Sequence, residues 1–119
     1  MAELTRADVI RIVAVTGHAR LSGVDLSGLD LRCLNLAGAD LTRANLTGAD
    51  LSNAYLRGAS LELAVLTGAV LAGANLKEVN LKGATLRDAD LRQAIMNDAN
   101  LFQTDLQGAN LEGVMGMGR

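Results

Sequence analysis

The chain has 119 residues, a formal net charge of −2 and 50% apolar residues, of which very few are aromatic. This length suits a single domain. The lone cysteine, Cys33, excludes an intrachain disulfide and fits a reducing compartment. No apolar run is long enough to span a bilayer, and Arg6, Asp8 and Arg11 interrupt any secretory hydrophobic region, so we expect a cytoplasmic protein.

The N-terminal segment 4–17 is predicted to be a helix. Thr5 is a good N-cap, and Asp8 follows three residues later in an arrangement like a capping box. Leu4 and Val9 could form a hydrophobic staple, and Gly17 marks a plausible end. We therefore expect residues 1–18 to act as a cap over the first part of the next segment.

From Leu21 to Leu111 a leucine returns every fifth residue, at eighteen of nineteen positions, with Met96 at the other. The residue two before it is Ala in fourteen cases, and the residue just before it is Asp or Asn in twelve. Gly stands two residues after it in ten cases. A repeat of this kind decides the architecture and takes precedence over window-by-window interpretation.

A period of five fits neither regular element. Five helical residues advance about 500°, which moves successive leucines about 140° around the helix, and an odd spacing in a strand alternates faces. A short extended piece followed by a corner places every leucine inside a narrow tube. Gly eases the turn, and Asp or Asn can hydrogen-bond to the nearby backbone. The spacing alone allows coils of three or four pentapeptides.

The stretch AGADLTRANLTGADLSNAYLRGASL resembles the pentapeptide-repeat family, whose consensus is A(D/N)LXX. The resemblance covers about residues 19–113. It implies an all-β solenoid, a right-handed quadrilateral β-helix of nearly five coils, capped at its N-terminal end by the short α-helix. The resemblance thus selects four sides over three.

The C-terminal segment is predicted to be a tail over residues 114–119, because the repeat would place Gly116 at a central position. This tail is too short for a covering helix, and an uncovered solenoid end exposes backbone and core side chains. We expect a homodimer stacked end to end at this face, or alternatively a monomer whose tail folds back. The residues of the expected dimer face are Leu106, Leu111, Val114 and Met115.

The potential catalytic and metal-binding residues are few and isolated, so we expect a protein that is not an enzyme and carries no cofactor or metal. His18 is the only histidine, and Cys33 stands at a corner position without a partner thiol. The many Asp residues recur at one repeat position, which is typical of corner chemistry. Lys77, Lys82, Arg87 and Arg92 form a basic series interrupted by acids, so direct nucleic-acid binding is not expected.

Acidic rods in the resembled family can mimic DNA and modulate the type II topoisomerase gyrase. Duplex DNA carries about one charge per 1.7 Å, so a rod of roughly 23 Å would need about thirteen net negative charges. Residues 21–113 hold eleven acidic and seven basic side chains, 7 − 11 = −4. DNA mimicry is therefore the alternative hypothesis, and the primary one is a noncatalytic repeat protein with a surface for protein–protein interaction.

The candidate interaction surface consists of outward repeat positions that carry apolar residues in place of the usual polar ones. Such a surface requires a contiguous patch, since scattered apolar residues are ordinary on proteins. We give equal weight to two arrangements of the candidate residues, a contiguous patch and a scattered distribution. The candidate residues are Tyr55, Leu63, Val65, Val70, Ile95 and Phe102.

Overall fold

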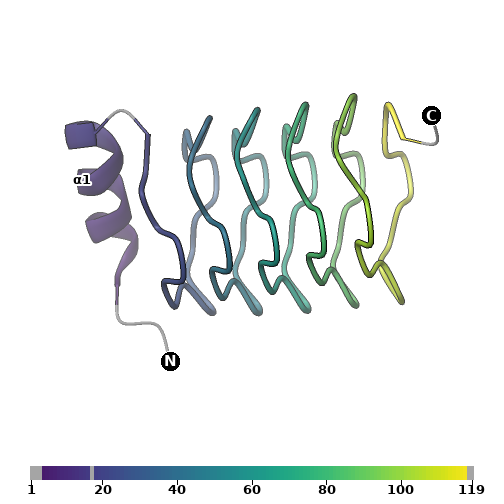
Figure 1. The fold of residues 1–119 in the computed structure, drawn as a ribbon, viewed down its shortest axis with the longest axis horizontal. Helices are drawn as coiled ribbons and strands as arrows, with labels where there is room; N and C mark the ends of the chain where they lie inside the picture. Colours follow the sequence, from purple (N-terminus) through teal and green to yellow (C-terminus); the bar gives the residue numbers. More distant parts are fainter. Residues whose placement is uncertain (1–3, 17, 118–119) are drawn as a thin grey trace.

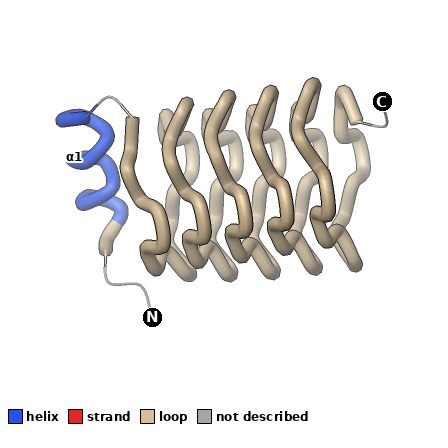
Figure 2. Tube along the Cα trace, viewed as in Figure 1, coloured by secondary structure: helices blue, strands red, loops and turns tan. Residues whose placement is uncertain are grey.

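The computed structural model describes residues 4–16 and 18–117. It is a short rod with principal extents of 36 × 26 × 21 Å, in which stacked coils follow one helix at the N-terminal end (Figure 1). The helix, α1, spans Arg6–Thr16. Elsewhere the described chain consists of turns and isolated bridges and contains no longer strand (Figure 2).

The coils are joined by parallel bridges between residues twenty positions apart. Sixteen such bridges occur in the described chain, and they form four ladders along the rod. The first ladder begins at Arg20, the second at Asp25, the third at Asp30 and the fourth at Asn35, and each continues every twenty residues. Four pentapeptides therefore complete one coil, which decides between the three- and four-sided alternatives. The chain forms a β-helical solenoid.

Backbone hydrogen bonds explain why one bridge per pentapeptide is enough. The N–H of Leu41 donates to the carbonyl of Ser60 in the next coil at 2.8 Å, and the N–H of Asn45 donates to Val24 in the previous coil at 3.0 Å. The same pattern recurs along the chain. Because neighbouring coils satisfy these buried groups, no long strand is needed to satisfy them.

The corner after each central residue is a β-turn with a left-handed residue. The N–H of Ala44 donates to the carbonyl of Leu41 at 3.0 Å, and Arg43 between them has φ 61°. All nineteen equivalent positions from 23 to 113 have positive φ, ten of them Gly. The side chains of the twelve Asp and Asn residues before the central positions accept a hydrogen bond from the backbone N–H two residues later, as Asp40 does from Thr42 at 3.1 Å. The expected local bonding is therefore confirmed.

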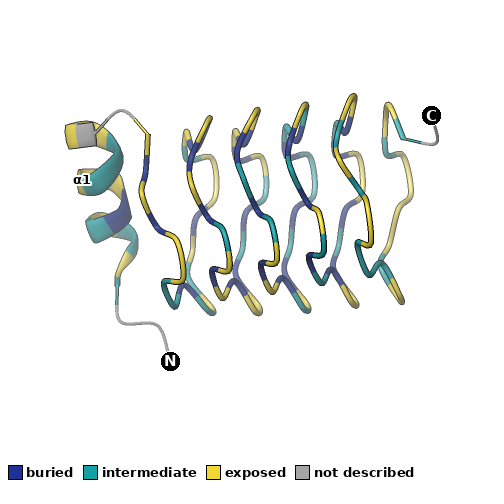
Figure 3. Ribbon diagram, viewed as in Figure 1, coloured by how far each residue is buried: buried dark blue, intermediate teal, exposed yellow. Residues whose placement is uncertain are grey.

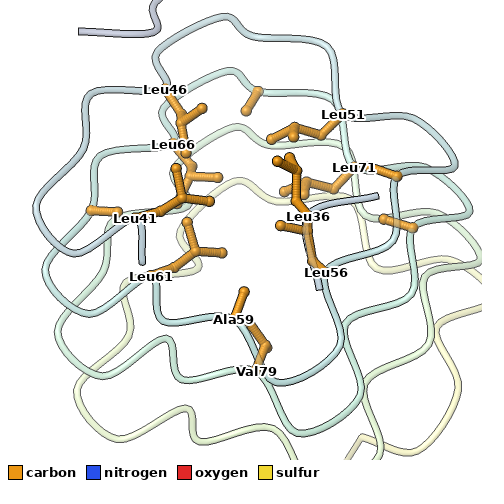
Figure 4. Close-up of a cluster of buried hydrophobic side chains, with 14 of the residues drawn as sticks. Leu36, Leu41, Leu46, Leu51, Leu56, Ala59, Leu61, Leu66, Leu71 and Val79 are labelled. Carbon is orange, nitrogen blue, oxygen red and sulfur yellow. The ribbon is translucent and has the colours of Figure 1, made fainter. Parts of the chain in front are cut away.

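The core is a column of leucine side chains flanked by alanines. The central residues from Leu21 to Met96 are at most 1% exposed, and the alanines two positions earlier, from Ala39 to Ala94, are buried as well. Figure 4 shows leucines of successive coils pointing into the same interior, with Ala59 and Val79 on one side. Leucine thus fills the tube without large aromatic rings.

Helix α1 covers the open end of the first coil. The predicted capping box is present, because the Thr5 hydroxyl accepts from the N–H of Asp8 at 3.2 Å and a carboxylate oxygen of Asp8 accepts from the N–H of Thr5 at 2.9 Å. Val9 is fully buried in the common core. The predicted end at Gly17 lies outside the described residues. In the first coil the larger Val24, Leu29 and Leu34 replace alanine and pack against the core at this end.

At the opposite end the core becomes progressively exposed (Figure 3). Leu101 and Leu106 are half-buried, and Leu111 is 36% exposed. The predicted boundary at residue 113 is two residues too early, because Met115 forms a bridge with Ile95 and its N–H donates to Ala94 at 3.0 Å. Val114 and Met115 occupy ordinary repeat positions, so the solenoid continues through them.

Candidate protein-interaction surface

The candidate apolar residues do not all meet on one side of the rod. Tyr55 and Ile95 belong to the fourth ladder, where Asn75 separates them. Val65 lies on the second ladder and Val70 on the third. These four residues are therefore distributed over three sides, which favours the scattered arrangement for most of the predicted set.

Leu63 and Phe102 lie at the same corner, between the first and second ladders, in different coils. Their exposed fractions are 42% and 61%, and Val65 beside this corner is 39% exposed. Leu63 extends along the rod over Gly83 of the next coil, because a Cβ placed on Gly83 would lie 2.8 Å from Cδ2 of Leu63. Two of the six predicted apolar residues thus lie at one corner, with a third on the adjoining ladder.

The acidic third ladder is largely neutralised by its own arginines. Arg32 Nε lies 2.9 Å from Asp30 Oδ1, and Arg92 Nη2 lies 2.7 Å from Asp90 Oδ2. The side-chain hydrogen bond from Arg32, followed by that from its backbone N–H, lowers the pKa of Asp30 to about 2. The third acid, Asp50, has an oxygen 3.9 Å from Arg32 Nε. The most acidic column therefore offers paired charges rather than a free anionic strip.

Ion pairs use most of the cations, and the few that remain gather near the first ladder. Ten Lys and Arg residues lie within 4–16 and 18–117, and six form ion pairs: Arg6, Arg11, Arg32, Arg57, Arg87 and Arg92. Four cations have no ion-pair partner in that same part of the chain: Arg20, Arg43, Lys77 and Lys82. One of these lies on the first ladder, and the other three lie at its two flanking corners.

The basic series predicted from the sequence is not a stripe. Lys77, Lys82, Arg87 and Arg92 are five residues apart, so they occupy the four corners of one coil and encircle the rod. Arg87 also pairs with Asp105. Spacing by five distributes side chains around a coil, whereas only spacing by twenty aligns them along it.

The single histidine and cysteine both lie near the covered end. The ring Nδ1 of His18 is 3.1 Å from the carbonyl oxygen of Ala37, which ties the junction to the next coil. Cys33 is an exposed free cysteine at a corner with φ 63°. No group of three or more His, Cys, Asp or Glu residues arranged to hold a metal ion occurs in the described sequence. No helix among these residues has the length and apolarity required to cross a membrane.

The expected dimer face exposes both backbone groups and core side chains. The N–H groups of Leu101, Leu106 and Leu111 make no hydrogen bond within the described chain, whereas their counterparts one coil earlier donate to the following coil. Met115 is 52% exposed and Val114 is half-buried. This end therefore has the character of an open sheet edge.

Comparison with known proteins agrees with the solenoid architecture. The family model described as pentapeptide repeats (8 copies) matches three overlapping stretches of the chain, residues 19–58, 44–83 and 80–115. The chain therefore belongs to the pentapeptide-repeat family. No curated protein sequence matches it significantly.

Solved structures of other pentapeptide repeat proteins resemble this one. Rfr23 from the cyanobacterium Cyanothece is 41% identical over 77% of this chain, with a TM-score of 0.76. A protein of the Arabidopsis thaliana thylakoid lumen is 32% identical over 80%, with a TM-score of 0.64. HetL of the cyanobacterium Nostoc is 36% identical over 86%, with a TM-score of 0.54. The chain spans 63% of the first two structures and 49% of HetL.

Proposed function

We propose that this protein is a noncatalytic repeat protein that presents a rigid surface to a protein partner. The observation that carries the proposal is the continuous leucine and alanine core, which fills the interior and leaves sequence variation to the outward positions. The same proposal includes a cytoplasmic location, because a single cysteine fits a reducing compartment. The proposal also includes a right-handed winding of nearly five coils.

Two further features support an interaction role. Outward positions depart from the repeat at one corner, where Leu63 and Phe102 are exposed. The related HetL is described as involved in the regulation of heterocyst differentiation, and regulation by a noncatalytic rod would act through binding. The pairing of Asp30 and Asp90 with arginines opposes the DNA-mimic alternative.

Cross-linking in an extract of the native host, followed by mass spectrometry, tests the proposal. We expect a saturable protein partner that excess free protein displaces. Failure to find a displaceable partner would refute the interaction role. A gyrase supercoiling assay addresses the alternative: we expect no change in activity, and inhibition at low micromolar protein would favour DNA mimicry instead.

A homodimer through the C-terminal face is a second part of the proposal. The unbonded N–H groups of Leu106 and Leu111 within the described chain, together with the exposed Met115, support pairing with a second copy. Light scattering should give a dimer mass at micromolar concentration. Replacing Leu111 and Met115 with Asp should restore a monomer, and a monomeric wild type would remove the dimer.

A further inference from the structure

One corner of the rod combines exposed apolar side chains with cations that lack an ion-pair partner in the described chain. We call this set the basic–apolar edge. It follows the corner between the first and second ladders in two neighbouring columns. Arg43 and Leu63 stack twenty residues apart in one column, and Lys82 and Phe102 stack in the other. Coils are about 4.8 Å apart, so the two cations are roughly 10 Å apart, as are the two apolar residues.

The apolar members are exposed beyond what the repeat requires. Phe102 is 61% exposed at a position that in the neighbouring coils holds a polar residue, and it contributes nothing to the buried core. Leu63 adopts φ 60° at a position where ten of nineteen repeats use Gly. Its side chain lies over Gly83, the residue after Lys82, and so reaches the coil that holds Lys82. The edge therefore consists of two adjoining columns at one corner.

From residue 42 to residue 103 the corner carries two cations, Arg43 and Lys82, and one acid, Glu62. Arg43 and Lys82 have no ion-pair partner among residues 4–16 and 18–117, while six other cations do. Glu62 lies at the same corner, one coil before Lys82 in its column, and accepts a hydrogen bond from Asn80 Nδ2 of the first ladder at 3.3 Å. A partner that supplies carboxylates would complement these two cations.

We propose that the basic–apolar edge binds an acidic amphipathic helix of a partner protein. This inference rests on the proposed interaction role and names its site. A helix lying along the rod repeats its facing residues about every 5.4 Å, close to the coil spacing. Positions i, i+4, i+7 and i+11 of that helix then meet successive coils. The matching order is carboxylate, apolar, carboxylate, apolar.

A protein partner fits this surface better than an anionic membrane does. The chain carries a net charge of −2, and Asp40 lies on the adjacent first ladder. An anionic lipid surface is broad and would meet these acids together with the two cations, whereas a single helix contacts only the edge. The proposal therefore commits to a narrow partner.

A display library of helical peptides, randomised at the four facing positions, tests the proposal with the full chain as target. We expect enrichment of Asp or Glu alternating with large apolar residues. Binding of a selected synthetic peptide should fall at least tenfold in Arg43→Ser/Lys82→Ser and in Leu63→Ser/Phe102→Ser. It should also weaken as salt is raised.

Two matched controls remove the same kinds of side chain elsewhere. Arg20→Ser/Lys77→Ser removes two cations that also lack ion pairs in the described structure. Tyr55→Ser/Ile95→Ser removes two apolar residues of the fourth ladder. Both should bind the peptide within twofold of wild type, and the urea midpoint of every variant verifies folding.

Several results would overturn the proposal. These are a library that yields no binder, selected peptides without acidic residues, or control variants that lose as much affinity as the edge variants. Edge-dependent binding to phosphatidylserine vesicles without peptide binding would assign the surface to lipid instead. If the host partner still binds the edge variants, the interaction role survives and the assignment of its site fails.

Discussion

Truncating a leucine in the middle coil should destabilise the protein far more than the same change at the C-terminal end. Leu61 is fully buried, and Leu61→Ala removes three carbon atoms at about 0.8 kcal/mol each, or about 2.4 kcal/mol. The cavity left in a closed tube adds about 1 kcal/mol or more. The total, about 3–4 kcal/mol, is a large fraction of the roughly 5–15 kcal/mol that stabilises a domain.

Leu111 provides the matched comparison, because the same substitution occurs at the same repeat position. Its side chain is 36% exposed, so about two thirds of the transfer energy applies, about 1.5 kcal/mol, and an open end leaves no enclosed cavity. Urea unfolding followed by circular dichroism gives both free energies. Equal losses for Leu61→Ala and Leu111→Ala would refute the closed-tube reasoning.

Three further predictions concern the cap, the corners and pH. Thr5→Ala removes the hydroxyl that accepts from the N–H of Asp8 and should lower the free energy of unfolding in urea by about 1 kcal/mol. An unchanged free energy of unfolding would count against the capping box. Gly68→Ala, at φ +67° with no described atom within 4 Å of the new Cβ, should cost about 1 kcal/mol from backbone strain alone, and a neutral result would contradict the left-handed corner. Asp30, whose pKa is held at about 2 by Arg32, contributes stability that is present above pH 3.8 and lost as pH falls toward 2. In Asp30→Asn the thermal midpoint should change less over that window, and the same slope as wild type would exclude the contribution.

The repeat pattern was sufficient to predict most of the fold. The inward leucines follow from the period of five, and the local bonding of residues such as Asp40 and the capping box of Thr5 and Asp8 depend on contacts close in sequence. The end of the solenoid was placed two residues early, because Val114 and Met115 were assigned to a tail although they fit the repeat. Each of these features depends on interactions within one pentapeptide or between one coil and the next.

The surface was less predictable. The basic series from Lys77 to Arg92 appeared continuous in sequence but encircles the coil. The acidic column could be assembled from residues twenty apart, yet the folding of Arg32 back onto Asp30 depends on side-chain positions that the pattern does not specify. Leu63 and Phe102 were identified as apolar departures, but their alignment with Arg43 and Lys82 was not predicted.

The amino-acid sequence by itself determined that leucines fill a narrow tube, because no other arrangement buries a residue at every fifth position. The tertiary structure decided which side chains become neighbours along the rod. Coils of twenty residues bring Arg43, Leu63, Lys82 and Phe102 to one corner, although they span sixty residues of sequence from 43 to 102. The physical reason is that coil stacking, rather than chain proximity, brings together side chains twenty residues apart.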